Sequence, residues 1–190
     1  MDLSVICFLA LLGGVGVTRL VELGISRRHQ RQLASRNIDQ RVDPQYPWMV
    51  ALHAGVLVAA VLEVVSLRRP FLPLIAVPAS LLFVLAAALR WWAIRSLGSH
   101  WNVRVMDSAT LGVVASGPFR WVRHPNYLGV FVEMTALPLI HTAWITALLA
   151  AAGNVWVLRN RLRVEEPMLE AHPQYRAAMS GKARFLPGIF

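Results

Sequence analysis

A short polar stretch lies directly before one of the apolar runs of this chain, at residues 117–130 (GPFRWVRHPNYLGV). Gly117-Pro118 predicts a turn, and Pro125 can begin a helix because its missing N–H would have no partner there. His124 then lies beside the first turn of that helix, where free backbone N–H groups and the helix dipole favour an anionic ligand group. A single histidine is also common as an ordinary hydrogen-bonded surface residue.

A second polar group follows the last apolar run, at residues 159–167 (RNRLRVEEP). Glu165 and Glu166 are consecutive carboxylates in an arginine-rich stretch, and Arg161 lies four residues before Glu165. The spacing is compatible with a helical ion pair worth about 0.2–0.5 kcal/mol. Because this group and His124 are expected at the same membrane face, the two groups together predict one site.

Ionisable residues also occur inside the apolar runs, where charge is costly and each one is a candidate functional residue. Glu133 lies midway along its run with no basic residue at helical spacing, and Asn126 precedes it by seven residues on the same helical face. Two interpretations stay open for Glu133. It either makes a hydrogen bond between helices or lines a polar pocket.

The other ionisable residues of the runs have simpler explanations. Arg19 and Glu22 are three residues apart and can pair on one helical face. Arg90 and Arg95 lie in the last two turns of their run, so their side chains can extend to the membrane surface. Glu63 is expected to be structural.

Helices that cross a membrane are expected to position these groups. Of the 190 residues 56% are hydrophobic, and the mean hydropathy is +0.51. That apolar fraction exceeds the usual 45–50% or so of soluble domains. The sequence predicts an all-α integral membrane protein of about five transmembrane helices and a single domain, residues 1–190. Residues 1–96 would hold three helices and residues 97–190 the catalytic half, with a cytoplasmic cofactor-binding region. The expected apolar segments are 3–25, 47–67, 71–96, 126–140 and 142–158, with a tight hairpin at His141-Thr142.

The net charge of +9 comes from arginines that cluster between the apolar runs, at 27–41, 104–123 and 159–184. This placement follows the positive-inside rule, which predicts an outer N-terminus, a cytoplasmic C-terminus and an active site that faces the cytoplasm of a bacterial cell membrane. The same placement argues against a nucleic-acid partner. The single cysteine, Cys7, excludes an internal disulfide and is expected to be a small buried apolar residue. No cluster has metal-ligand spacing, so no metal site is predicted.

The stretch SGPFRWVRHPNYLGV, followed by RLRVEE, ML and QYRAA, resembles the isoprenylcysteine carboxyl methyltransferase family. The resemblance covers about residues 97–187. RHPxY together with a downstream RxxxEExxL is a specific combination, whereas RHPxY alone also occurs in related sterol reductases. LGSHWNVRV (97–105) and the flanking motifs look closest to a bacterial branch associated with type III polyketide synthases, which is thought to O-methylate alkylpyrones or alkylresorcinol-derived quinones.

The resemblance implies a membrane methyltransferase that uses S-adenosyl-L-methionine and has no Rossmann domain. It implies that Arg161 faces the methyl acceptor, a lipophilic small molecule or a prenylated substrate that arrives from the bilayer. Phe119 stands where the family often has tyrosine, and Met106 where eukaryotic members have glutamine. The implied cofactor-binding residues are Val113, Val114, Phe119, His124, Pro125, Asn126, Tyr127 and Glu165.

The charges of this cofactor fit these residue types. Glu165 can bind its ammonium group, His124 and the adjacent helix N-terminus can bind its carboxylate, and aromatic side chains tolerate its sulfonium. Arg161 can orient an anionic acceptor oxygen, which needs no general base. A neutral phenol would need one, and Glu133 and Glu166 are then the candidates. Two alternatives remain, an NADPH-dependent enzyme that resembles sterol reductases and a membrane scaffold or transporter without catalytic function.

Overall fold

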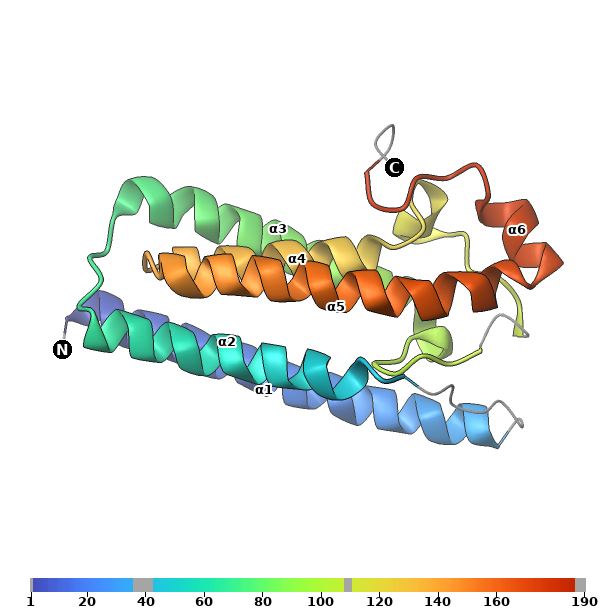
Figure 1. The fold of residues 1–190 in the computed structure, drawn as a ribbon, viewed down its shortest axis with the longest axis horizontal. Coiled ribbons are helices and arrows are strands. Elements are labelled where there is room, and N and C mark those ends of the chain that lie inside the picture. Colours follow the sequence, from blue (N-terminus) through green and yellow to red (C-terminus); the bar gives the residue numbers. More distant parts are fainter. Residues whose placement is uncertain (1, 36–42, 108–110, 187–190) are drawn as a thin grey trace.

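The computed structural model describes residues 2–35, 43–107 and 111–186, which are mostly helical. Long helices run along the molecule (Figure 1), and short helical turns lie at one end of it. Among the described residues no strand occurs, and an isolated parallel bridge joins Val122 to Ala183. The long helices are α1 (Leu3–Ala34), α2 (Tyr46–Ser66), α3 (Pro73–Leu97), α4 (Pro125–Leu139) and α5 (Trp144–Glu170); the short ones are η1 (Gly98–His100), η3 (Gly117–Arg120) and α6 (Pro173–Met179).

Two helices extend well beyond the expected apolar segments. α1 continues from Ile25 through the arginine-rich stretch to Ala34, and α5 continues from Leu158 to Glu170. Helix formation outlasts the apolar pattern because the added stretches contain no glycine, and their one proline, Pro167, comes within the last turn of α5. The RVEE motif is therefore helical. The other helices begin and end close to the expected residues.

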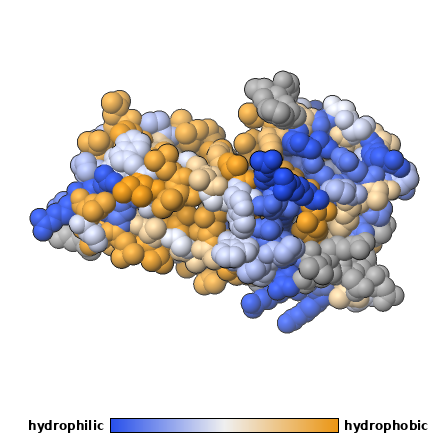
Figure 2. All heavy atoms as spheres, in the orientation of Figure 1, coloured by the Kyte–Doolittle hydropathy of each residue, from blue (hydrophilic) through white to orange (hydrophobic). Residues whose placement is uncertain are grey.

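Successive long helices reverse direction, with α1 and α2 on one side of the molecule and α3, α4 and α5 on the other (Figure 1). The C-terminal ends of α1, α3 and α5 and the N-terminal ends of α2 and α4 thus share one end with α6. Hydrophilic residues gather over this end in Figure 2, which we call the arginine-rich end, while apolar residues dominate the rest of the visible helical surface. The N-terminus lies at the opposite end.

Three segments of the described chain are long and apolar enough to cross a membrane: α1, α2 and Pro73–His100, which contains α3 and η1. α4 has 15 residues and extends about 22 Å at 1.5 Å per residue, less than the hydrocarbon thickness of about 30 Å. Three candidate spans are therefore present. The count of five spans and the cytoplasmic side of the C-terminus remain predictions.

Close packing joins α3, α4 and α5. A Cβ added to Gly129 of α4 would lie 3.1 Å from the carbonyl oxygen of Ala86 in α3, so the two backbones approach where only glycine fits easily. Between α4 and α5 the expected tight turn is confirmed, and Thr142 adopts a φ of 53° with its hydroxyl donating to the carbonyl oxygen of Pro70. Cys7, expected to be buried, is exposed on the outside of α1.

Glu63 of α2 has the structural role that the sequence predicts. Its carboxylate accepts hydrogen bonds from the backbone N–H groups of Ile145 and Thr146 at 3.1 and 2.7 Å and pairs with Arg69 at 2.7 Å. These N–H groups belong to the first turn of α5, where the helix itself provides no partner. Glu63 thereby caps α5 from a neighbouring helix.

The remaining intramembrane charges form a closed ring of alternating sign from three helices. Arg19 pairs with Glu22 at 3.1 Å and with Glu133 at 2.7 Å. Arg90 pairs with Glu133 at 3.0 Å and also with Glu22. The Arg19–Glu22 pair is confirmed, but the expectation for Arg90 was wrong: its side chain is buried and does not reach the membrane surface. Two buried carboxylates compensate the positive charge of Arg90, which would cost several kcal/mol to bury without a partner.

Candidate active site at the arginine-rich end

The polar stretch before α4 is held by a turn that requires glycine. Gly117 has a φ of +59°, and a Cβ at this position would lie 2.1 Å from the hydroxyl oxygen of Ser96. The turn leads into η3, which buries Phe119. His124 then precedes Pro125, the first residue of α4, as the sequence predicts.

The C-terminal segment fastens this stretch from outside. The backbone N–H of Arg123 donates to the carbonyl oxygen of Ala183, and that of His124 donates to the carbonyl oxygen of Arg184, both at 2.9 Å. The Lys182 ammonium donates to the carbonyl oxygen of Phe119 at 2.7 Å. Residues 182–184 therefore form a strap across residues 119–124. We call this segment the C-terminal strap.

Glu166 joins the strap to α5. Arg184 donates to both carboxylate oxygens of Glu166, at 2.9 and 2.7 Å, while His124 Nε2 lies 3.3 Å and Arg123 Nη2 3.6 Å from Oε1. The hydrogen bond with His124, together with that from Arg184, lowers the pKa of Glu166 to about 2. Such a carboxylate holds its neighbours in place but is a weak base at neutral pH.

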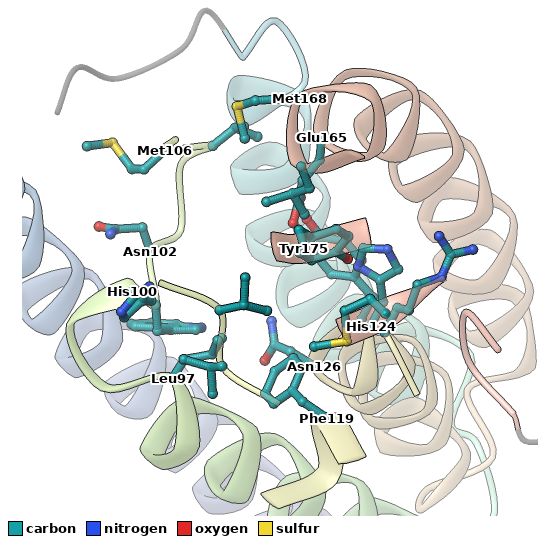
Figure 3. Close-up of a pocket in the computed structure, with 18 of the residues that line it drawn as sticks. Leu97, His100, Asn102, Met106, Phe119, His124, Asn126, Glu165, Met168 and Tyr175 are labelled. Carbon is teal, nitrogen blue, oxygen red and sulfur yellow. The ribbon is translucent and has the colours of Figure 1, made fainter. Parts of the chain in front are cut away.

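A cavity opens beside these residues at the arginine-rich end (Figure 3), and we call it the polar cavity. His124, Asn126, Glu165 and Tyr175 converge on it from α4, α5 and α6 and the residues just before α4. Burial raises the pKa of Tyr175 to about 12, so its hydroxyl stays neutral at physiological pH and can donate a hydrogen bond. Apolar side chains complete the wall: Leu97, Met106, Val113, Val114, Phe119, Met168, Leu169 and Met179.

Tyr127, Glu165 and Arg161 form a connected group in the wall of the polar cavity. The Tyr127 hydroxyl donates to Glu165 Oε2, and Arg161 Nε lies 3.8 Å from the same oxygen. The Arg161 guanidinium also stands 5.7 Å from the centre of the Tyr127 ring and donates to the carbonyl oxygen of Val103 at 2.6 Å. The Arg161–Glu165 pairing allowed by the spacing is thus present, but as one contact among several.

A second cavity, of about 410 Å³, lies among α1, α2, α4 and α5 and is lined mainly by apolar side chains. We call it the apolar cavity. Its volume is in the usual range for small-molecule sites, roughly 300–1,000 Å³. Five residues line both cavities and form what we call the junction: Trp101, Asn102, Asn126, Tyr127 and Arg161.

The junction contains buried polar atoms that make no hydrogen bond to any described residue. Nδ2 of Asn102, Oδ1 of Asn126 and Nε of Arg161 are all buried without a hydrogen-bond partner in that part of the chain. Leaving such atoms unpaired costs about 1–3 kcal/mol each. Native proteins accept this cost chiefly where a ligand or another group completes the bonding. The junction therefore has the character of a ligand site.

The predicted site residues divide into two groups. Most line the polar cavity: Val113, Val114, Phe119, His124, Asn126, Tyr127, Arg161 and Glu165. Pro125 is buried beneath it as the first residue of α4, and Glu166 lies behind His124. Glu133 lines neither the polar nor the apolar cavity; its carboxylate is held in the charged ring by Arg19 and Arg90.

Some residues of the site escaped sequence reasoning. Asn102 and Trp101 follow η1 in the stretch LGSHWNVRV, and Tyr175 lies in the QYRAA motif. The polar and aromatic residues of the loop after the third apolar run were an available signal for Asn102. Ser26 of α1 ties this loop in place, because its hydroxyl accepts from the backbone N–H of Val103 at 3.0 Å and donates to Asn102 Oδ1 at 3.3 Å.

Comparison with known proteins identifies relatives that cover most of the chain. Relatives include the uncharacterized protein YpbQ of Bacillus subtilis, 27% identical over 157 residues, which are 82% of this chain and 92% of the relative. An uncharacterized protein of Haemophilus influenzae is 27% identical over 149 residues, or 78% of this chain and 86% of that protein.

The chain was also compared with protein families. Residues 79–171 match the sequence profile of the isoprenylcysteine carboxyl methyltransferase family. The matched segment includes the end of α3, the polar stretch, α4 and α5, and with them His124, Tyr127, Arg161 and Glu165. Across these residues, which hold most of the candidate site, the chain is similar to the isoprenylcysteine carboxyl methyltransferase family.

Proposed function

We propose that this protein is a membrane methyltransferase that uses S-adenosyl-L-methionine to methylate an oxygen of a lipophilic acceptor. One observation carries the proposal. A polar cavity at the arginine-rich end and an apolar cavity among the helices meet at a junction that contains Arg161 and unpaired polar atoms. The family match over residues 79–171 supports a methyltransferase, and the two cavities suit one water-soluble and one lipophilic reactant.

The polar cavity contains residues that suit S-adenosyl-L-methionine. Glu165 offers a carboxylate for the ammonium group, and His124 at the N-terminus of α4 offers a setting for the carboxylate. Phe119 and Tyr175 provide aromatic surface for the adenine and the sulfonium. The cavity encloses about 140 Å³, less than usual for such a ligand, so we expect its wall to move outward on binding.

Arg161 is the residue that we propose to hold the acceptor. It is buried at the junction, and its planar guanidinium can orient an anionic oxygen by two hydrogen bonds. Bound S-adenosyl-L-methionine supplies an electrophilic methyl group on a sulfonium. Positioning of the two reactants then provides much of the rate in an in-line displacement.

The acceptor oxygen is proposed to be ionised before methyl transfer. The two carboxylates considered as general bases are poorly placed for that role. Arg19 and Arg90 hold Glu133, which lines neither the polar nor the apolar cavity, and three cationic or hydrogen-bonding neighbours hold Glu166. A carboxylate or an acidic enol needs no base at pH 7. We therefore favour such acceptors over a neutral phenol.

Binding measurements with the detergent-solubilised protein test the proposal. S-adenosyl-L-methionine and its demethylated product should bind with a chelator present, and NADPH should not compete. Methyl transfer from labelled cofactor to an alkyl hydroxypyrone or an S-prenylcysteine should follow. Binding of NADPH in place of S-adenosyl-L-methionine would assign the polar cavity to a reductase-like function and overturn the proposal.

A further inference from the structure

Besides the junction residues and the ring residues Glu22 and Arg90, three polar side chains from three helices line the apolar cavity: Arg19 of α1, His53 of α2 and Asn154 of α5. They lie away from the junction along the helix axes. Asn154 precedes Arg161 by seven residues on α5, and Arg19 precedes Ser26, the residue bonded to Asn102, by seven on α1. At 1.5 Å per residue both separations are about 10 Å. We call these three residues the inner polar group.

Each member has at least one polar atom that no described residue pairs. His53 Nδ1 lies 2.8 Å from the carbonyl oxygen of Met49, which can only accept, so Nδ1 carries the proton and Nε2 keeps a lone pair. Asn154 donates from Nδ2 to the Met134 sulfur at 3.2 Å, which leaves its amide oxygen to accept. The terminal nitrogens of Arg19 bind the ring carboxylates, and its Nε–H has no partner among the described residues.

The inner polar group therefore offers the cavity two acceptors, His53 Nε2 and Asn154 Oδ1, and one donor, the Nε–H of Arg19. The charged ring explains Arg19 as a structural residue, but it includes neither His53 nor Asn154. A few convergent polar groups in an apolar pocket are the usual basis for ligand orientation and specificity. A ligand with only a hydrocarbon chain at this position would exclude water from these polar atoms without giving them hydrogen-bond partners, which costs binding free energy.

We propose that the acceptor of this enzyme carries a hydroxyl group about 10 Å from the oxygen that is methylated, and that the inner polar group binds it. A hydroxyl both donates and accepts, so it can pair with His53 or Asn154 and with Arg19 at once. A carbonyl can only accept and would leave the imidazole and amide acceptors unpaired. The inference rests on the proposed function, since it assigns the apolar cavity to the acceptor.

The test uses alkyl hydroxypyrones of one chain length, one with a plain chain and a series with a hydroxyl at successive chain carbons. Affinity is measured with the detergent-solubilised protein in the absence of cofactor. We expect one hydroxyl position to bind about 10- to 100-fold more tightly than the plain chain, the effect of one well-made buried hydrogen-bonded group. His53→Leu and Asn154→Leu should remove this preference, whereas His53→Gln should retain part of it.

His141→Leu is the matched control, because His141 is also buried but lies in the turn between α4 and α5, outside the apolar cavity. It should keep the preference. The inference is wrong if no hydroxyl position improves binding, or if the preference survives both leucine variants. Adding S-adenosyl-L-methionine to the same panel separates this result from the proposed function. Methylation of the plain chain without any hydroxyl preference would support the proposed function and overturn the inference. Tight hydroxyl-dependent binding without methylation would support the hydroxyl site and overturn the proposed function.

Discussion

Arg161 and Glu165 lie one turn apart on α5, but their surroundings differ. Arg161 lines both cavities, whereas Glu165 lines the polar cavity and not the apolar one. Glu165 is also the more exposed of the two side chains, at 22% against 5%. A simple ion pair would be worth only a few tenths of a kcal/mol. The geometry instead supports separate tasks, cofactor binding for Glu165 and acceptor binding for Arg161.

Substitution of Glu165 tests the first task. Glu165→Gln should weaken S-adenosyl-L-methionine binding by roughly 10- to 150-fold, the loss of a charge-assisted contact worth about 1.5–3 kcal/mol. Calorimetry on the solubilised protein measures this effect. Glu170→Gln is the control, because Glu170 lies on the same helix outside the polar cavity and should bind the cofactor normally. Equal affinities of both variants would remove Glu165 from the cofactor site.

Substitution of Arg161 tests the second task. Arg161→Lys keeps the positive charge but loses the planar pair of donors, so cofactor affinity should persist while turnover falls at least tenfold, an order-of-magnitude expectation. The measurement is cofactor affinity and methyl-transfer rate on the same preparation. A parallel loss of affinity in Arg161→Lys and Glu165→Gln, with unchanged turnover, would mean that the two residues form only an ion pair.

At the residue scale the sequence predicts the side chains of the polar cavity better than the intramembrane charges. His124, Asn126 and Tyr127 are consecutive or nearly so, and local turn and helix rules locate them. The partners of Glu133 are Arg19 and Arg90, which lie 114 and 43 residues earlier in the chain. Helical spacing describes neighbours on one helix and carries no information about such pairs.

Hydrogen bonds to backbone carbonyl groups hold the C-terminal strap to the residues before α4, and charge holds it to α5. Arg184 and His124 both bind Glu166 and lower its pKa from 4.5 to about 2. A carboxyl whose pKa is lower in the folded state stabilises the fold fully above its unfolded pKa, near 4.5, and loses that contribution as the pH falls towards 2. The attachment of the strap to α5 should therefore weaken in acid.

Comparison with Glu166→Gln checks the pH dependence. Above about pH 5 the wild-type protein should melt at a higher temperature than Glu166→Gln, since glutamine carries no charge to bind Arg184. The difference should shrink between about pH 4 and pH 2, where the wild-type carboxyl becomes protonated and resembles the amide. Thermal unfolding in detergent at several pH values gives the measurement. A difference that stays constant down to pH 2 would show that charge does not hold the strap.

The contact between α3 and α4 is the second interaction between elements that positions the site. A Cβ at Gly129 would meet the Ala86 carbonyl oxygen at 3.1 Å and the Arg90 side chain at 3.3 Å. Gly129→Ala should therefore destabilise the protein by about 1–3 kcal/mol, the usual effect of overpacking. Gly55→Ala on α2 is the control, because nothing lies within 4 Å of its Cβ position. There alanine should be neutral or stabilising by up to about 1 kcal/mol. Thermal unfolding compares the two, and equal stabilities would contradict the close contact.

The elements themselves follow closely from the apolar pattern, but their ends do not. Apolar length locates the cores of α1, α2 and α3, which need only a bilayer-sized run of residues. α1 and α5 continue into arginine-rich sequence because arginine is a good helix former, so the loss of hydropathy does not mark a helix end. The extension of α5 is what carries Arg161, Glu165 and Glu166 to the site.

At the scale of the whole molecule, the apolar cavity unites both halves of the chain. α1 and α2 contribute Arg19 and His53, and α4 and α5 contribute Asn126 and Asn154. Sequence reasoning assigns the catalytic residues to the second half and treats the first three helices as generic. The cavity could not be predicted from the sequence, because it depends on which faces of α1 and α2 turn towards α5.

The direction of the helices also gives the molecule two different ends. The arginine-rich loops and the C-terminal strap share one end, and the α2–α3 connection and the α4–α5 turn lie at the other (Figure 1). The polar cavity opens at the first end. If the cofactor comes from the cytoplasm, this end must face inwards, as the positive-inside rule also predicts.

Reporter fusions test this orientation. A fluorescent protein fused after Phe190 should be active, and a reporter that works only outside the cytoplasmic membrane should be silent at the same position. The opposite pattern is expected for reporters inserted between α2 and α3, next to Arg68 and Arg69, since two arginines are outweighed by the larger number at the other end. Fusions at both sites in one strain background control for expression. An extracellular signal after Phe190 would place the polar cavity outside the cell, away from the cytoplasmic cofactor, and would contradict the proposed topology and function together.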